Sequence, residues 1–122
     1  MIKTALAFTG LLVAILLPQP ALGQLDDQKL GNVHFETSCT QDAQKLFDLG
    51  MLYQHSFWYR ASQKSFEDTL KADPDCGIAY WGIALSLLYN PHVAPPAKNL
   101  KEGAAAIEKG KAVGAKTQRE RD

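Results

Sequence analysis

The sequence predicts an all-α fold, in which two helix-turn-helix hairpins stack as a short α-solenoid and a further helix starts at the C-terminus. The first observation is an internal echo 34 residues apart, in which large residues answer large ones and small residues answer small ones. Leu46, Phe47, Leu49, Gly50 and Tyr53 correspond to Tyr80, Trp81, Ile83, Ala84 and Leu87. The second observation is that prolines follow the second and third helical patterns. A self-match of this period is typical of stacked helical hairpins.

The chain begins with the layout of a secretory signal peptide, which we predict at 1–23. Lys3 gives an early positive charge, the stretch from 5 to 17 is apolar, and the small-residue ending Ala21-Leu22-Gly23 predicts cleavage before Gln24. An uncleaved membrane anchor is the alternative, but this stretch is short against the ~20 residues that a spanning helix needs. We therefore expect a periplasmic or secreted protein that has no membrane contact after cleavage.

An irregular N-terminal segment is expected at 24–39, and the first helix follows from about Thr40 to His55. The side chain of Ser38 or Thr40 can cap the free amides of this helix, and Asp42 favours the positive end of its dipole. Apolar residues recur along it at helical spacing, which predicts one buried face.

Prolines bound the second and third helices. The second should span about Trp58 to Ala72 and end at Asp73-Pro74, because a residue before proline is pushed out of helical geometry. The third should run from about Cys76 to Tyr89, with Asp75 as its cap and Asn90-Pro91 as its end. Short connections between these helices predict antiparallel hairpins.

The fourth helix is predicted from about Ala97 to Val113, with Gly114 in the expected stop position. Thr117 and Glu120 have the spacing of a capping box, which should open another helix. Because only a few residues follow, we expect 117–122 to be the start of a truncated third repeat, which would make the chain a fragment of a longer array.

The spacing of large and small residues within each hairpin matches a known repeat family. The signature positions of the first hairpin are Leu46, Leu49-Gly50, Tyr53, Ser62, Phe66 and Pro74. The pattern resembles the tetratricopeptide repeat, with Leu46 where tryptophan is usual and Ser62 where alanine is usual. The resemblance implies two repeats within 40–116, at about 42–75 and 76–114. The second repeat is longer, and an insertion at 90–96 accounts for its extra seven residues.

A narrower resemblance is to exported bacterial proteins built from such repeats. Its motifs, in chain order, are the entry segment Val33-His34-Phe35 with Thr37-Ser38-Cys39, then His55-Ser56-Phe57, Asp73-Pro74-Asp75-Cys76 and Ala79-Tyr80-Trp81-Gly82. The resemblance covers roughly residues 31–122. It implies an exported scaffold and carries over no established chemistry.

Small residues are expected where the helices approach most closely, at Gly50, Ala84, Gly103 and Gly110. Helix axes come within ~8–10 Å when the contact residues are small. Glycine inside a helix costs roughly 0.5–1 kcal/mol against alanine, so Gly50 and Gly110 need a packing reason. The aromatic residues at signature positions are expected in the core, namely Tyr53, Tyr59, Phe66 and Tyr80.

Cys39 and Cys76 are the only cysteines, and an oxidising compartment favours their pairing. Both lie near the starts of equivalent helices, which stack side by side in arrays of this kind. We therefore expect a disulfide between Cys39 and Cys76, with two buried thiols as the alternative.

The other reactive side chains predict no catalytic residue, no metal site and no cofactor. His34, His55 and His92 match no zinc-binding spacing. A metal site built from His34, Cys39, Cys76 and His92 would need reduced cysteines, which an oxidising compartment disfavours. The 13 basic and 13 acidic residues balance, so there is no electrostatic case for a nucleic-acid partner.

A partner-binding groove is implied by the resemblance. The residues that fall on the concave face of similar proteins are Phe47, Met51, Gln54 and His55 in the first repeat and Ile78, Trp81, Leu85 and Leu88 in the second. Such grooves bind peptides or helices by shape and by a few anchor side chains. Trp81 is the best single anchor, because large aromatic side chains dominate the energetics of interfaces.

The expected function is that of a non-catalytic, exported scaffold of the tetratricopeptide type, which binds a protein or peptide through its helix faces. One alternative is the N-terminal fragment of a longer enzyme or redox-linked protein whose active part is missing. Another is a self-assembling structural module, because terminal repeats expose apolar edges that stack on one another.

Overall fold

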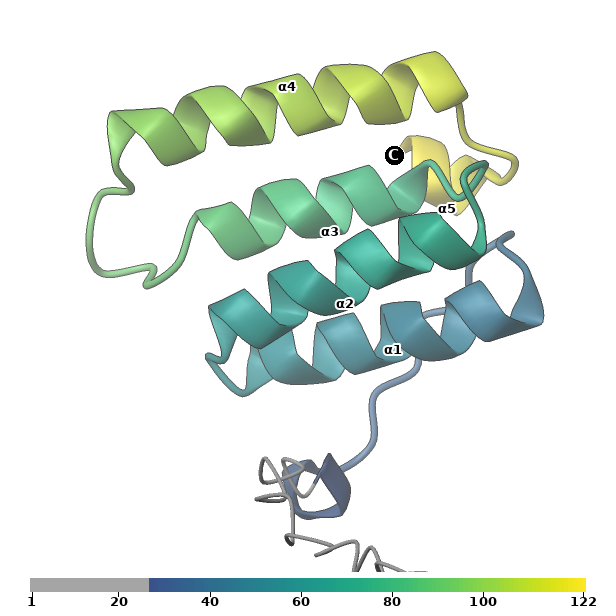
Figure 1. Ribbon diagram of the computed structural model, residues 1–122, viewed down its shortest axis with the longest axis horizontal. Coiled ribbons are helices and arrows are strands. Elements are labelled where there is room, and N and C mark those ends of the chain that lie inside the picture. Colours follow the sequence, from purple (N-terminus) through teal and green to yellow (C-terminus); the bar gives the residue numbers. More distant parts are fainter. Residues whose placement is uncertain (1–26) are drawn as a thin grey trace, which may run out of the picture.

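Four packed helices form the body of the protein. The computed structural model describes residues 27–122, so the predicted signal peptide lies outside the described residues. This described part of the chain contains helices and loops but no strand. Its helical elements are the 3-10 turn η1 (Asp27–Leu30), α1 (Gln41–His55), α2 (Tyr59–Ala72), α3 (Ile78–Leu87), α4 (Ala97–Val113) and α5 (Gln118–Arg121). Figure 1 shows α1 to α4 side by side in chain order. The predicted all-α fold class is confirmed.

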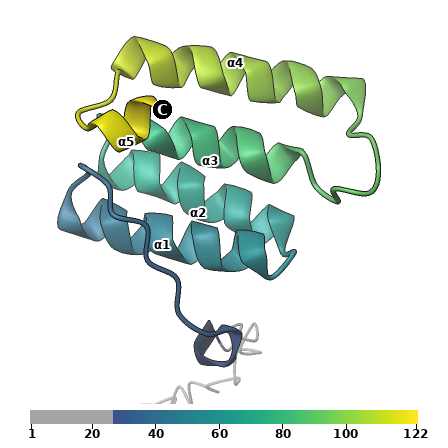
Figure 2. The same ribbon diagram turned by 180° about the vertical axis from the view of Figure 1, so that it is seen from behind.

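The four long helices pair into two stacked hairpins. α1 packs on α2 and α3 packs on α4, and α2 contacts α3 where the hairpins meet. The opposite view in Figure 2 shows the same order of helices from behind. α1, α2 and α4 begin and end within one residue of the predicted bounds, but α3 is two residues shorter at each end. Tyr89 adopts a left-handed φ of 53°, which does not continue a helix.

Phe66 lies at the centre of the core, between the two hairpins, and is fully buried. An added Cβ at Gly50 of α1 would lie 2.7 Å from its ring, so the predicted packing reason for Gly50 is confirmed. Gly82 of α3 approaches the same ring equally closely, which the sequence analysis did not predict. Gly110 is also closely packed, as predicted, since its Cβ would lie 3.1 Å from the Cβ of Tyr80 and from the carbonyl oxygen of Gly77. Gly103 is buried against Ala84 of the facing helix as predicted, although an added Cβ would make only ordinary contact there, at 3.7 Å.

The predicted helix caps at Thr40 and Asp75 are wrong. Thr40 precedes α1 but its side chain makes no capping hydrogen bond, and Gly77, not Asp75, precedes α3. The carboxylate of Asp73, which is buried, instead accepts hydrogen bonds from the backbone amides of Thr40 (2.8 Å) and Asp75 (3.1 Å). One carboxylate therefore ties the start of α1 to the turn before α3.

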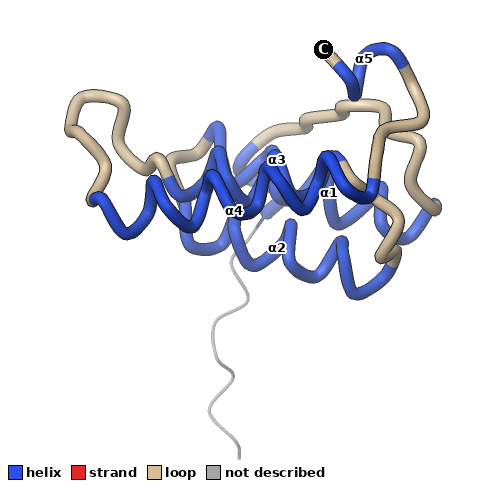
Figure 3. Tube along the Cα trace, turned by 90° about the horizontal axis from the view of Figure 1, so that it is seen from above, coloured by secondary structure: helices blue, strands red, loops and turns tan. Residues whose placement is uncertain are grey.

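The segments before α1 and after α4 meet on one side of the helix layer. We call residues 31–39 the lead segment; they form no helix, whereas the N-terminal segment that was expected to be irregular contains η1. Figure 3 shows α5 standing off the layer of long helices. The capping box predicted for Thr117 and Glu120 is present and opens α5. Within residues 27–122, none of the helices has the length and apolar character needed to cross a membrane.

Candidate functional site

The residues predicted to line a binding groove do not form one open surface. Phe47 and Met51 are 0% and 7% exposed and belong to the core. Val33 and Phe35 of the lead segment pack against this part of the core. In this structure Phe47 and Met51 therefore line no open groove, and Phe35 of the lead segment packs on Phe47.

The other predicted groove residues lie in four different surroundings. Gln54 is half-buried and accepts a hydrogen bond from the hydroxyl of Ser62 (3.0 Å), whereas His55 is exposed at the end of α1. Ile78 lies beside a cavity under the C-terminal turn. The last three line a groove between α3 and α4: Trp81, Leu85 and Leu88.

Two side chains of α1 bind the backbone of the lead segment. The Gln44 carboxamide donates to the carbonyl oxygen of Phe35 (2.8 Å) and accepts from the amide of Thr37 (2.8 Å). Asp48 accepts from the amide of Phe35 (3.0 Å) and from Nε2 of Gln44 (2.9 Å). Because Gln44 and Asp48 are four residues apart, both project from the same face of the helix. The lead segment is thus bound through its main chain.

The Phe35 side chain is anchored among aromatic and basic groups. Its ring centroid lies 5.7 Å from that of Phe47 and 6.3 Å from that of Trp81, to which it is stacked. The guanidinium carbon of Arg119 lies 4.0 Å above the same ring, in the geometry of a cation–π contact. Contacts of this kind bury an apolar body and orient it. Phe35 is therefore the anchor of the lead segment.

A partly enclosed cavity of about 630 Å³ lies under the C-terminal turn, beside the Phe35 anchor. Its lining comes from the lead segment, α3, α4 and the C-terminal turn, and combines apolar side chains with both basic and acidic ones: Phe35, Ile78, Trp81, Ile107, Lys111, Arg119, Glu120 and Asp122. A second, shallower space of about 310 Å³ continues between α3 and α4. Trp81 borders both spaces and is 37% exposed. Its ring is therefore accessible from outside while it contacts the lead segment.

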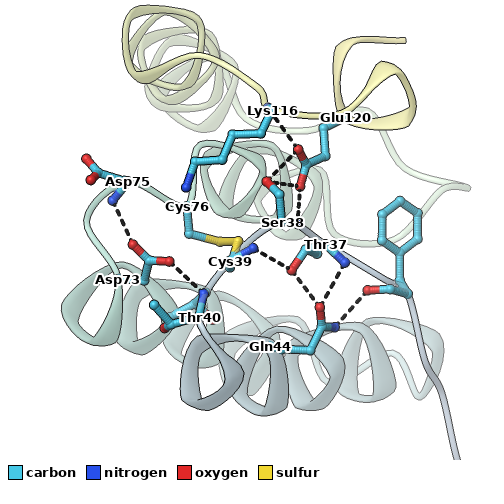
Figure 4. The surroundings of a disulfide bond; sticks show 12 residues. Thr37, Ser38, Cys39, Thr40, Gln44, Asp73, Asp75, Cys76, Lys116 and Glu120 are labelled. Atoms are coloured by element: carbon cyan, nitrogen blue, oxygen red, sulfur yellow. Dashed lines mark hydrogen bonds between the residues drawn. A yellow bond between two sulfur atoms is a disulfide. The ribbon is translucent and has the colours of Figure 1, made fainter.

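Glu120 of α5 fastens the C-terminal turn to the lead segment. Its carboxylate accepts hydrogen bonds from the amide (2.7 Å) and hydroxyl (2.8 and 2.9 Å) of Ser38, and from the amides of Lys116 and Thr117 (Figure 4). Partial burial by itself raises the pKa of Glu120, but these hydrogen bonds, led by those from Ser38, outweigh burial and lower it. The contact therefore favours the charged carboxylate.

The predicted disulfide is present and fixes the end of the lead segment. The sulfur atoms of Cys39 and Cys76 are at bonding distance, 1.97 Å, and their Cα atoms are 5.0 Å apart (Figure 4). Cys76 is almost fully buried beside the core. The bond joins the residue before α1 to the turn before α3, as the hydrogen bonds of Asp73 also do.

The functional residues that sequence reasoning missed are Gln44, Asp48, Phe35 and the Ser38–Glu120 pair. A signal for the lead segment was available, since Val33, Phe35 and Thr37 alternate with the exposed His34 and Glu36. Alternation of this kind is the period of an extended chain lying on a surface. No comparable signal marks Gln44 and Asp48, because polar residues at helical spacing are common on solvated faces.

The histidine and the two cysteines of this face are engaged in structural contacts. The side chain of His34 contacts Asp48 (2.7 Å), and both cysteines are consumed by the disulfide. In the part of the chain that the structure describes, no three His, Cys, Asp or Glu side chains come together in a way that could bind a metal ion. Comparisons with protein-family models, with curated proteins and with solved structures found no match.

Proposed function

We propose that this protein is a non-catalytic, exported scaffold of the tetratricopeptide type, which binds a protein or peptide partner on the face formed by α1 and α3. The observation that carries the proposal is that this face already binds an extended segment, through Gln44, Asp48 and the Phe35 anchor. The stacked hairpins and their 34-residue echo support the repeat assignment. The disulfide supports export, because oxidising compartments preserve such bonds.

Trp81 is the anchor that a partner would contact first. It stands between the cavity under the C-terminal turn and the groove between α3 and α4, and a third of its surface is open. Large aromatic side chains in such positions contribute disproportionately to binding energy. A partner that covers Trp81 can extend along Leu85 and Leu88, of which Leu88 is 46% exposed.

A pull-down from periplasmic extract with the oxidised mature chain tests this proposal. Trp81→Ala should lose the proteins that the wild-type chain recovers. Trp58→Ala is the matched control, because Trp58 is also 37% exposed but lies at the turn between α1 and α2. Recovery of the same proteins by both variants would refute the assignment of the binding face, provided that circular dichroism shows both to be folded.

Self-assembly is a second candidate, favoured by the apolar groove between α3 and α4. Leu88 and Leu100 border this groove and are 46% and 50% exposed. Exposed apolar rows on terminal helices stack on one another in repeat arrays. Sedimentation at two protein concentrations tests this candidate: an assembly that dissociates on Leu100→Glu supports it, and a monomer at both concentrations refutes it.

A further inference from the structure

The lead segment is bound in the manner of a peptide ligand. Resting on the function proposed above, we propose that the partner of this face is an extended segment of another protein with an aromatic residue at the place of Phe35. In this chain the lead segment occupies the site as an intramolecular ligand. The partner binds by displacing it.

The main-chain contacts define an extended occupant without fixing its sequence. The carbonyl oxygen of Phe35 and the amide of Thr37 are the two groups that a neighbouring strand would pair with. The single carboxamide of Gln44 satisfies both, and Asp48 takes the amide of Phe35. The hydrogen bond between Gln44 and Asp48 holds the two side chains in register. Any extended segment presents the same backbone groups, so these contacts transfer to a partner.

Within residues 31–37, polar and aromatic side-chain contacts are made at three positions: His34 contacts Asp48 (2.7 Å), the hydroxyl of Thr37 donates to Gln44 (2.6 Å), and Phe35 makes the aromatic contacts. Val33, Phe35 and Thr37 face the helices and are half-buried, whereas His34 and Glu36 are exposed. Among these, only Phe35 is surrounded by aromatic rings and a guanidinium group. An aromatic residue in the partner would reproduce these contacts, and a small residue would not.

The lead segment can leave the site from its N-terminal end. The Cys39 disulfide and the hydrogen bonds of Ser38 to Glu120 fix its other end. Upstream, Gly31 has a left-handed φ of 91° and no atom within 4 Å of the place where a Cβ would stand, and Asn32 is exposed. Displacement of residues 31–37 therefore leaves the disulfide and the four-helix core in place.

Fluorescence anisotropy with a labelled heptapeptide of the sequence of residues 31–37 tests the proposal. The oxidised mature chain carrying Phe35→Ala should bind this peptide roughly tenfold more tightly than the wild-type chain, whose own lead segment occupies the site. The variant Glu36→Ala is the matched control and should behave as wild type, because Glu36 is exposed. Adding Gln44→Ala to the Phe35→Ala chain should abolish binding.

Two further peptides separate the contribution of the phenylalanine to binding from that of other side chains. A peptide with alanine in place of the phenylalanine should not bind, and one with alanine in place of the exposed Asn32 and Glu36 should bind within a fewfold. If Phe35→Ala does not fold, Phe35→Leu replaces it, and amide exchange in the Gln44→Ala chain reports whether the amide of Thr37, whose acceptor is Gln44, is released. A protected Thr37 amide in that variant would overturn the proposal.

Equal binding of the peptide to wild type and Phe35→Ala, or binding to neither, overturns the inference. Concentration-dependent dimers that exchange their lead segments would also overturn it, since the occupant would then be a second copy. These results differ from a failure of the proposed function. If Trp81→Ala loses its partners but the heptapeptide does not bind to Phe35→Ala, the scaffold proposal remains. The partner would then bind in the groove between α3 and α4.

Discussion

Replacing Gly50 by alanine should destabilise the protein, although alanine is the better helix former. The ring of Phe66 is fully buried where α1, α2 and α3 meet. A Cβ at Gly50 would lie 2.7, 2.8 and 2.9 Å from three carbon atoms of this ring. Carbon atoms pack at roughly 3.5–4.0 Å, so the ring has to move. Gly82 of α3 is equally close on the same ring, which leaves it no free space to move into.

The magnitude follows from two opposing terms. Removing glycine from a helix stabilises by roughly 0.5–1 kcal/mol, whereas overpacking a core costs about 1–3 kcal/mol. The net loss for Gly50→Ala is about 1 kcal/mol, which lowers the melting temperature of a domain of this size by roughly 4–8 °C. Gly103→Ala is the matched control in α4. Its Cβ would meet Ala84 at 3.7 Å, an ordinary contact, so only the stabilising term remains.

Thermal unfolding of the oxidised chain, followed by circular dichroism at helical wavelengths, measures both variants. Gly103→Ala should melt above the wild type and Gly50→Ala below it. The double variant Gly50→Ala/Phe66→Leu should be less destabilised than the sum of its single substitutions, because a smaller side chain relieves the clash. If Gly50→Ala raises the melting temperature as much as Gly103→Ala does, the close packing of Phe66 is refuted.

Three further predictions concern the contacts that join the ends of the fold. Replacing Cys39 and Cys76 by serine should lower the free energy of unfolding by about 4 kcal/mol, for a closed loop of 37 residues, as measured with denaturant. The pKa of Glu120 is lower in the folded than in the unfolded chain, so its stabilisation is complete above the ordinary value of 4.5 and is lost as the pH falls through the folded value. Glu120→Gln should flatten that part of a stability–pH curve; an unchanged slope would contradict the contact with Ser38. Asp73→Ala should cost about 1 kcal/mol, because two loop amides lose their acceptor, and an unchanged denaturation midpoint would rule this out.

The helices and the disulfide could be predicted because they depend on local patterns and on the compartment. Helical periodicity and proline fixed the bounds of α2 and α4, and the count of two cysteines left a single pairing. The close approach of Gly82 to Phe66 was not predicted, because the 34-residue echo pairs Gly50 with Ala84 and not with Gly82. Which small residue meets a large ring depends on how the two hairpins are rotated. That rotation is a tertiary property.

The capping predictions failed for a related reason. Thr40 has the residue type and position of a cap, but a distant carboxylate, Asp73, binds its amide. Ser38 likewise offers its hydroxyl and amide to Glu120, which is 82 residues away in the chain. Local rules describe which groups need a partner. They do not say whether that partner is close in the sequence. For the same reason they do not predict that Gln44 and Asp48 bind the backbone of the lead segment.

The last prediction concerns how substitutions change capture of the partner. Because the lead segment competes with the partner, a substitution that weakens binding of the lead segment should increase capture. A tethered lead segment competes at an effective concentration of the order of millimolar, so a partner sees only the fraction of chains whose site is open. Phe35→Ala weakens the competitor and should increase capture of the partner from extract. Trp81→Ala removes an anchor from the face itself and should decrease it. Circular dichroism shows whether both variants are folded, and a decrease in both folded variants would contradict the competition between lead segment and partner.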